Sequence, residues 1–115
     1  MKRICRQTTI YVGLNDSVTR EQKFETPKYI SILTKVCVNY NVAFSLDLID
    51  GGYIHEDGTY VEEKTIALMM IDVPKETVEE IARDLCAFFR QESVMVAEAP
   101  AKVFFVQEKL LDETR

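Results

Sequence analysis

The side chains of this chain that could do chemistry together gather around one Asp-Gly pair. Asp57-Gly58 lies between two β-rich runs and fits the centre of a two-residue type I′ turn, which predicts a long β-hairpin. In this register the single histidine of the chain, His55, lies opposite Tyr60, and Tyr53 lies opposite Glu62. An imidazole, two phenols and a carboxylate on one face are able to relay a proton or hold a polar ligand. We therefore predict a ligand-binding site at Tyr53, His55, Tyr60 and Glu62.

Simpler interpretations of these residues stay open. Strand propensity alone explains tyrosines in a hairpin, and His55 is then a solvent-exposed residue of the tip. As a metal site the cluster is weak, because one imidazole with Glu56, Asp57 or Glu62 does not supply three convergent ligands. Glu92-Ser93 has no histidine or lysine at a catalytic spacing, so we assign it a structural role. We predict no catalytic residues, no metal and no cofactor.

The same register sorts the hairpin, which we place over Phe44–Asp72, into two faces. One face is uniformly apolar and carries Phe44, Leu46, Leu48, Ala67, Met69 and Ile71. The other carries Ser45 and Asp47 together with Ile49, Ile66, Leu68 and Met70. If helices cover the first face, the second leaves a contiguous apolar patch in water, which monomers rarely do. We therefore predict self-association through Ile49, Ile66, Leu68 and Met70, most simply as a two-fold homodimer.

Asp50-Gly51-Gly52 sets a condition on this prediction. The segment is not a phosphate loop, because it lacks the Lys-Ser/Thr pair and a following helix. Two glycines inside a strand more often mark a bulge. With a bulge, the register holds only from Tyr53 to Glu62, and the face assignment reverses for Phe44–Leu48.

Composition limits the classes of protein to which the chain can belong. Its 115 residues, 47% hydrophobic and 29% charged, are typical of one globular domain over residues 1–115. The net charge of −5 argues against binding to nucleic acid or to an anionic membrane, because both would repel the chain. Neither a signal peptide nor an apolar run of membrane length is apparent, so we expect a cytoplasmic protein unless a leader was removed. Cys5, Cys37 and Cys86 have no C-x-x-C spacing and indicate no disulfide framework.

Hydrophobic periodicity predicts the elements that position these residues. They are a strand over 7–14, a helix over 27–41, the hairpin over 44–72, a helix over 74–91 and a strand over 94–106. Pro100 removes a ladder donor from the last strand, which places that strand at a sheet edge. The order β-α-β-β-α-β predicts an α+β, ferredoxin-like fold: a four-stranded antiparallel sheet with two helices on one face and the first and third strands in its centre.

Three segments resemble a family of small bacterial and phage-borne proteins known as a domain of unknown function, DUF3574. They are Thr8–Leu14, Asp57–Ile66 and Phe89–Val96, similar in order and spacing over residues 7 to 106. The phrase Gln91-Glu92-Ser93-Val94 is the most specific part. The resemblance implies a ferredoxin-like fold and no established activity, so it brings no catalytic residues. Many members of that family carry export signals, and none is apparent in this sequence, so the resemblance implies no compartment.

Three classes of function follow from these observations. The first is a noncatalytic binding or assembly module that self-associates through its open sheet face, and we favour it because no catalytic set is visible. The second is a dimeric α+β-barrel enzyme with a substrate pocket near His55. The third is an acidic, phage-type inhibitor of a host protein, whose negative second helix mimics a nucleic acid. We predict a homo-oligomer and leave open whether a further partner is a protein or a small molecule.

Overall fold

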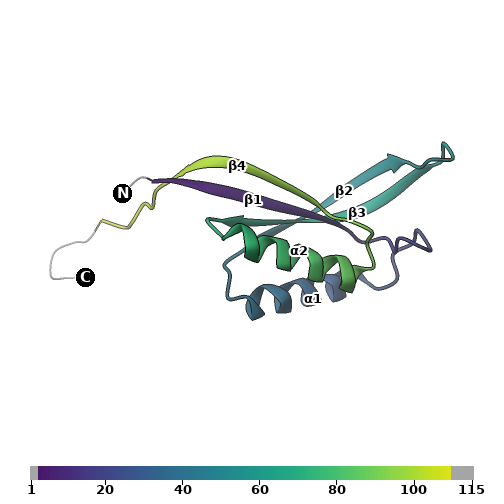
Figure 1. The fold of residues 1–115 in the computed structure, drawn as a ribbon, viewed down its shortest axis with the longest axis horizontal. Helices are drawn as coiled ribbons and strands as arrows, with labels where there is room; N and C mark the ends of the chain where they lie inside the picture. The colour runs from purple at the N-terminus through teal and green to yellow at the C-terminus, as the bar shows by residue number, and fades with distance from the viewer. Residues whose placement is uncertain (1–2, 110–115) are drawn as a thin grey trace.

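A computed structural model, which describes residues 3–109, confirms the predicted ferredoxin-like fold (Figure 1). The elements, in chain order, are β1 (Arg3–Gly13), α1 (Thr26–Asn39), β2 (Ser45–Ile54), β3 (Tyr60–Ile71), α2 (Lys75–Phe89) and β4 (Met95–Val103). The strands form one antiparallel sheet in the order β2-β3-β1-β4. As predicted, the first and third strands are central and β4, which contains Pro100, is at an edge.

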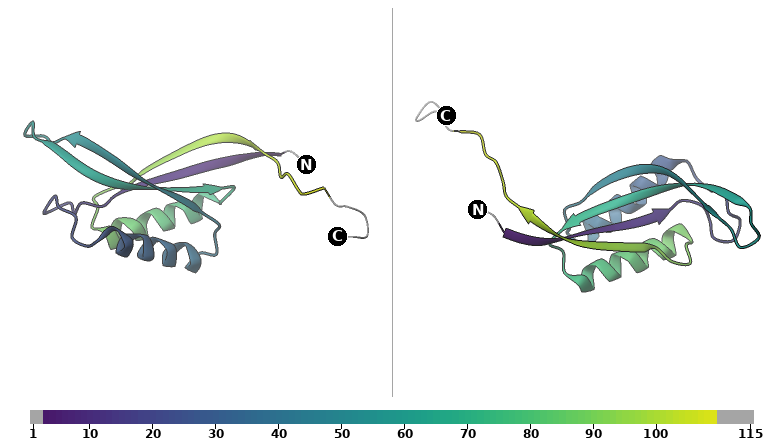
Figure 2. Two further views of the ribbon diagram at one scale, coloured as in Figure 1. Left: turned by 180° about the vertical axis from the view of Figure 1, so that it is seen from behind. Right: turned by 90° about the horizontal axis from the view of Figure 1, so that it is seen from above.

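Both helices cover the same face of the sheet, and the other face is open (Figure 2). The core lies between the helices and the central strands, because each helix presents one apolar stripe and β1 and β3 alternate apolar residues toward it. Its fully buried members include Ile10 and Val12 of β1, Leu14 directly after β1, Leu33 of α1, and Ile81 and Leu85 of α2.

The sheet is longer than the helices that cover it. The β2–β3 hairpin projects past the helices at one end, and β1 and β4 project together at the other (Figure 1). The described residues accordingly span 65 Å along the longest axis and only 27 and 25 Å across it. Two stretches of strand therefore have no helix against them, one at each end.

The predicted hairpin register is wrong by one residue. His55 pairs with Thr59 through a hydrogen bond of 2.8 Å from the His55 N–H to the Thr59 carbonyl, and Tyr53 pairs with Val61. The loop therefore has three residues instead of two, with Gly58 in the left-handed region at φ 88°. This is the common alternative in which a type I turn is followed by a glycine that forms a bulge. Asp57-Gly58 suits both turns, so the dipeptide alone does not set the register.

A shift of one residue exchanges the two faces of a strand, and the predicted association face changes with it. Ile66, Leu68 and Met70 are 0%, 0% and 1% exposed and pack in the helix-covered core. They cannot form an exposed patch, so their assignment to the open face is wrong. Of the four predicted interface residues, Ile49 alone lies on the open face, where it pairs with Thr65.

The prediction that Ala67, Met69 and Ile71 of β3 face the helices is wrong for the same reason. All three lie on the open side: Ala67 opposite Asp47, Met69 opposite Ser45, and Ile71 beyond the end of β2.

Within residues 3–109, no helix is long and apolar enough to cross a bilayer.

Candidate functional site

The end of the sheet from which the hairpin projects is closed by the loop between β1 and α1. Asp16 organises this loop, because its Oδ1 accepts the backbone N–H of Val18 at 2.8 Å and of Thr19 at 3.2 Å. These two hydrogen bonds hold the pKa of Asp16 below its ordinary value, against the opposing effect of burial. Asp16 is therefore a charged, nearly buried acceptor that fixes the loop.

The end of α2 is tied to the same loop. Arg90 ends the helix in the left-handed conformation at φ 54°, and its Nε donates to Asp16 Oδ2 at 2.6 Å. The Arg90 carbonyl accepts the N–H of Ser17 at 3.0 Å, and the Gln91 side-chain amide donates to the Asn15 carbonyl. A non-glycine residue in this backbone region is uncommon and is held by its surroundings. The loops after β1 and after α2 therefore form one hydrogen-bonded unit.

Glu63 of β3 brings a carboxylate to this unit. Its Oε2 accepts the backbone N–H of Asn15 at 3.0 Å. The carboxylate lies across Gly13, where an added Cβ would overlap it. Burial raises the pKa of Glu63, against the hydrogen bond from Asn15. No lysine or arginine forms an ion pair with Glu63 among residues 3–109, so its charge is partly desolvated without a cation beside it.

Three segments enclose a hollow of about 430 Å³ at this end of the sheet, which we call the end pocket. Its walls come from the loop at 15–20, the hairpin at 53–56 with Glu63, and the turn at 91–93. Its carboxylates are Asp16, Glu56, Glu63 and Glu92, and its one guanidinium is that of Arg20. The end pocket is therefore acidic, and its volume is within the range of small-molecule sites.

The structure separates the four predicted ligand residues into two pairs. Tyr53 and His55 line the end pocket. Tyr60 and Glu62 line a neighbouring hollow of about 600 Å³, where the Tyr60 ring lies across Gly52. Because pairing follows 54 with 60 and 52 with 62, these two side chains point to the opposite face from Tyr53. The four residues therefore do not form one cluster.

His55 has a specific environment within the end pocket. Its Nδ1 lies 3.5 Å from Asp57 Oδ1, and Asp57 Oδ2 lies 3.7 Å from Arg20. The buried Nδ1 has no hydrogen-bond partner among the described residues. Hydrogen bonds from Thr59, with His55 and Arg20 nearby, lower the pKa of Asp57. His55 is thus a partly covered wall residue, and the interpretation as a simple exposed tip residue does not describe it.

Sequence reasoning missed the residues that organise the end pocket, namely Asn15, Asp16, Glu63, Arg90 and Gln91. They come from positions as far apart as 15 and 91, and their meeting depends on how β1 and α2 end. One signal was present: the segment Gln91–Val94 was the most specific part of the family resemblance. The structural role that we predict for Glu92 and Ser93 does not mention a ligand, and both residues lie in the pocket wall.

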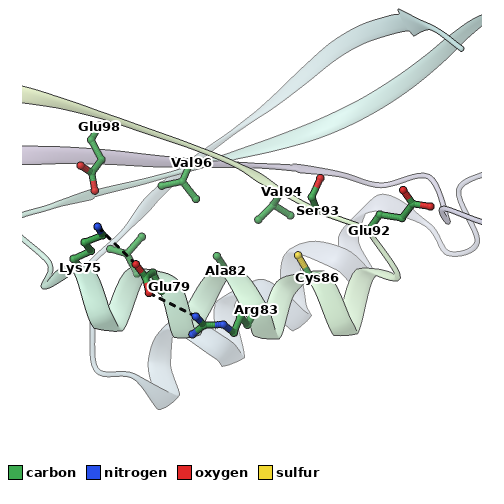
Figure 3. Close-up of a pocket in the computed structure, with 11 residues that line it drawn as sticks. Lys75, Glu79, Ala82, Arg83, Cys86, Glu92, Ser93, Val94, Val96 and Glu98 are labelled. Carbon is green, nitrogen blue, oxygen red and sulfur yellow. Dashed lines mark ion pairs between the residues drawn. The ribbon is translucent and has the colours of Figure 1, made fainter. Parts of the chain in front are cut away.

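A second concave region lies between α2 and the edge strand β4, and we call it the α2–β4 groove. It has a volume of about 640 Å³. Figure 3 shows Ala82 and Cys86 of α2 pointing toward Val94 and Val96. On its outer side, Glu79 lies 4.0 Å from Lys75 and 3.6 Å from Arg83. The groove is thus apolar along its floor and charged along its rim, unlike the end pocket.

The fold of this chain is similar to that of several solved structures. No family model and no curated protein matches the chain, so the resemblance to DUF3574 stays a prediction. The chain is similar to a phage SAM lyase solved with S-methyl-5′-thioadenosine, at 20% identity and a TM-score of 0.66, covering 86% of this chain and 88% of the lyase.

The chain is also similar to CPII from Thiomonas intermedia K12. One CPII structure, bound to ADP, AMP and acetate, is 14% identical with a TM-score of 0.55, covering 91% and 93% of the two chains. In another, a nitrogen regulatory PII-like protein bound to ADP, AMP and bicarbonate, the identity is 14%, the TM-score 0.52 and the coverage 90% and 99%. At these identities the likeness establishes the shared fold.

Proposed function

We propose that the end pocket binds a small, positively charged adenosine derivative, with S-adenosylmethionine as the leading candidate. The observation that carries the proposal is Glu63, a partly buried carboxylate whose pKa is raised by burial and which faces a pocket rich in other carboxylates. A desolvated carboxylate without its own cation favours a ligand that brings one. S-Adenosylmethionine brings a sulfonium and an ammonium group.

The structural neighbours support the adenosine part of the proposal, and the local charge supports the sulfonium part. The phage lyase was solved with a thioadenosine and CPII with ADP and AMP, so adenosine is common to these ligands. Even with Asp16 paired to Arg90, the end pocket has three other carboxylates and one lining arginine, which disfavours the phosphates of ADP or AMP. Gln91, Ser93 and Tyr53 supply neutral polar groups for a base or a ribose.

Lyase activity is a second candidate function, and the raised pKa of Glu63 favours it as well. When the carbon–sulfur bond of S-adenosylmethionine breaks, the electron pair stays on sulfur and S-methyl-5′-thioadenosine leaves as a neutral thioether. The remaining four-carbon fragment loses a proton to a base from the carbon next to the one that left sulfur, and the electron pair of that C–H bond forms a carbon–carbon double bond. A carboxylate with a raised pKa is a better base than an ordinary one, and Glu63 is that group here.

Isothermal titration calorimetry tests the binding. We expect S-adenosylmethionine to bind more tightly than AMP, and Glu63→Gln to weaken that binding about 10- to 100-fold, the effect of losing one charged hydrogen-bond partner. Gly13→Ala should weaken it too, because the new Cβ displaces the Glu63 carboxylate. Glu76→Gln, on the exposed first turn of α2, is the matched control. Tighter binding of AMP, or no binding of either compound, contradicts the proposal.

Mass spectrometry tests the lyase candidate separately. Incubation of the native protein with S-adenosylmethionine should release S-methyl-5′-thioadenosine, and Glu63→Gln should slow the release while Glu76→Gln leaves it unchanged. Binding without release identifies a noncatalytic binding module.

We also propose that the protein is cytoplasmic and that it self-associates through the open face of its sheet. The open face carries Ile49 and Ile71, each 40% exposed, and Met95, which is 62% exposed. Ala67 lies opposite Tyr11, and Tyr11 lies opposite Met95, so apolar and aromatic side chains continue across this face. This surface replaces the one predicted from the wrong register.

A further inference from the structure

The chain carries an exposed apolar segment directly after its last strand. Phe104, Phe105 and Val106 follow β4 without belonging to any helix or strand, and Phe105 and Val106 are 78% and 86% exposed. The segment continues away from the helices beyond the end of β4 (Figure 2). Consecutive large apolar side chains with this exposure mark an interaction surface.

The same chain has an apolar recess next to an unpaired strand edge. β4 is the last strand in the sheet order, so its outer edge presents backbone C=O groups and, except at Pro100, N–H groups that no other described strand pairs. The α2–β4 groove runs beside that edge, with Val96 40% exposed and Cys86 partly exposed on its floor (Figure 3). An extended segment added along β4 would pair with the edge and place alternate side chains in the groove.

The segment cannot fill the groove of its own chain. Val96 precedes Val103 by seven residues of strand, a distance of roughly 23 Å. Phe104–Val106 is three residues long and extends at most about 10 Å from Val103, even when it is fully stretched. The apolar residues would therefore stop beside the last residues of β4 and leave Val94 and Val96 uncovered.

We propose that the α2–β4 groove receives Phe104–Val106 from a second copy of this chain. The incoming segment adds to the outer edge of β4 and places Phe105 against Val96 and Cys86. A reciprocal exchange of the two segments closes a dimer with two identical contacts. The proposal is independent of any ligand in the end pocket and uses neither the open sheet face nor Ile49.

Cysteine cross-linking between two differently labelled chains tests the contact. One chain carries Phe105→Cys with Cys86→Ser, and the other keeps its native Cys86. Cys5 and Cys37 are buried and serve as internal controls. After mild oxidation we expect a disulfide-linked peptide that joins position 105 of one chain to Cys86 of the other, with the linked species at twice the chain mass. A chain with Val18→Cys and Cys86→Ser is the matched control, because Val18 is 75% exposed in the loop after β1.

Two further results sharpen the test. Val96→Lys in the receiving chain should abolish the cross-link while the circular dichroism spectrum stays native, since Val96 is half exposed and outside the buried core. The proposal is overturned if Val18→Cys links to Cys86 as well as Phe105→Cys does, or if no 105-to-86 peptide forms. It is also overturned if a single chain with Phe105→Cys and native Cys86 links these two positions within itself.

Discussion

The two faces of β3 carry apolar residues in nearly equal number, yet they have different roles. Ile66, Leu68 and Met70 are buried against the helices, whereas Ala67 and Met69, the residues between them, face the open side. Hydrophobicity alone does not distinguish the faces. What distinguishes them is the geometry of a turn about ten residues away, because one extra loop residue reverses every side chain that follows. The comparison shows that a strand with two apolar faces takes its orientation from its neighbours.

The largest loss of stability should come from shortening a side chain of β3 that faces the core. Leu68→Ala removes a fully buried side chain and leaves a cavity, so we expect the free energy of unfolding to fall by about 2–5 kcal/mol. Met69→Ala, one residue along the same strand, is the matched control, and its effect should be below about 1 kcal/mol. Urea denaturation followed by circular dichroism measures both. Equal losses for the two variants would mean that the core face is assigned wrongly.

On the open face, we expect a substitution to change the oligomeric mass and to have a smaller effect on the stability of the fold. Ile49→Lys should leave the fold intact but place a charged side chain in a sheet-to-sheet contact. We expect light scattering to show a lower mass for this variant than for the native protein. Val38→Lys, at a 65% exposed position of α1 on the other side of the molecule, should keep the native mass. A monomeric native protein, or an unchanged mass for Ile49→Lys, argues against association through the open face.

The fold could be predicted from the sequence because its signals are local and mutually consistent. Helical stripes, alternating strands and Pro100 at an edge each restrict the topology, and together they leave the ferredoxin-like arrangement. The register could not be predicted, because Asp57-Gly58 fits two turn types that differ by one residue. The true faces follow only from pairing β3 with β1, where Ile10 lies opposite Leu68 and Val12 opposite Ile66.

The candidate site could be predicted only in part, since half of it depends on tertiary contacts. Tyr53 and His55 were found because a hairpin places residues by local pairing. Asp16 and Arg90 are 74 residues apart, and their contact requires that β1 and α2 end at the same end of the sheet. The predicted register does not indicate Glu63, because it pairs Tyr53 with the neighbouring Glu62, whose side chain in fact points to the opposite face.

The smallest expected change in stability comes from the ionisation of Glu63. This residue lies on β3 and lines the end pocket, so it links the faces of β3 to that pocket. Its pKa in the folded protein is raised above the ordinary 4.5, so the folded state holds the proton more tightly than the unfolded chain does. Stability is therefore lost as pH rises from the unfolded pKa through the folded pKa, and the loss persists above it. Glu63→Gln removes this loss and retains an oxygen for the Asn15 N–H, so the variant should be more stable than the native protein at pH 7.

The difference should disappear at about pH 3, well below the ordinary pKa of 4.5, because the carboxyl group is then protonated in both the folded and the unfolded states. Urea denaturation at both pH values measures it, with Glu62→Gln as the control on the opposite face of β3. A stabilisation of the same size at both pH values would indicate a packing effect unrelated to the charge. A destabilisation at pH 7 would mean that the carboxylate is compensated in the folded protein, and Glu63 would then lose its role as the group that attracts a cationic ligand.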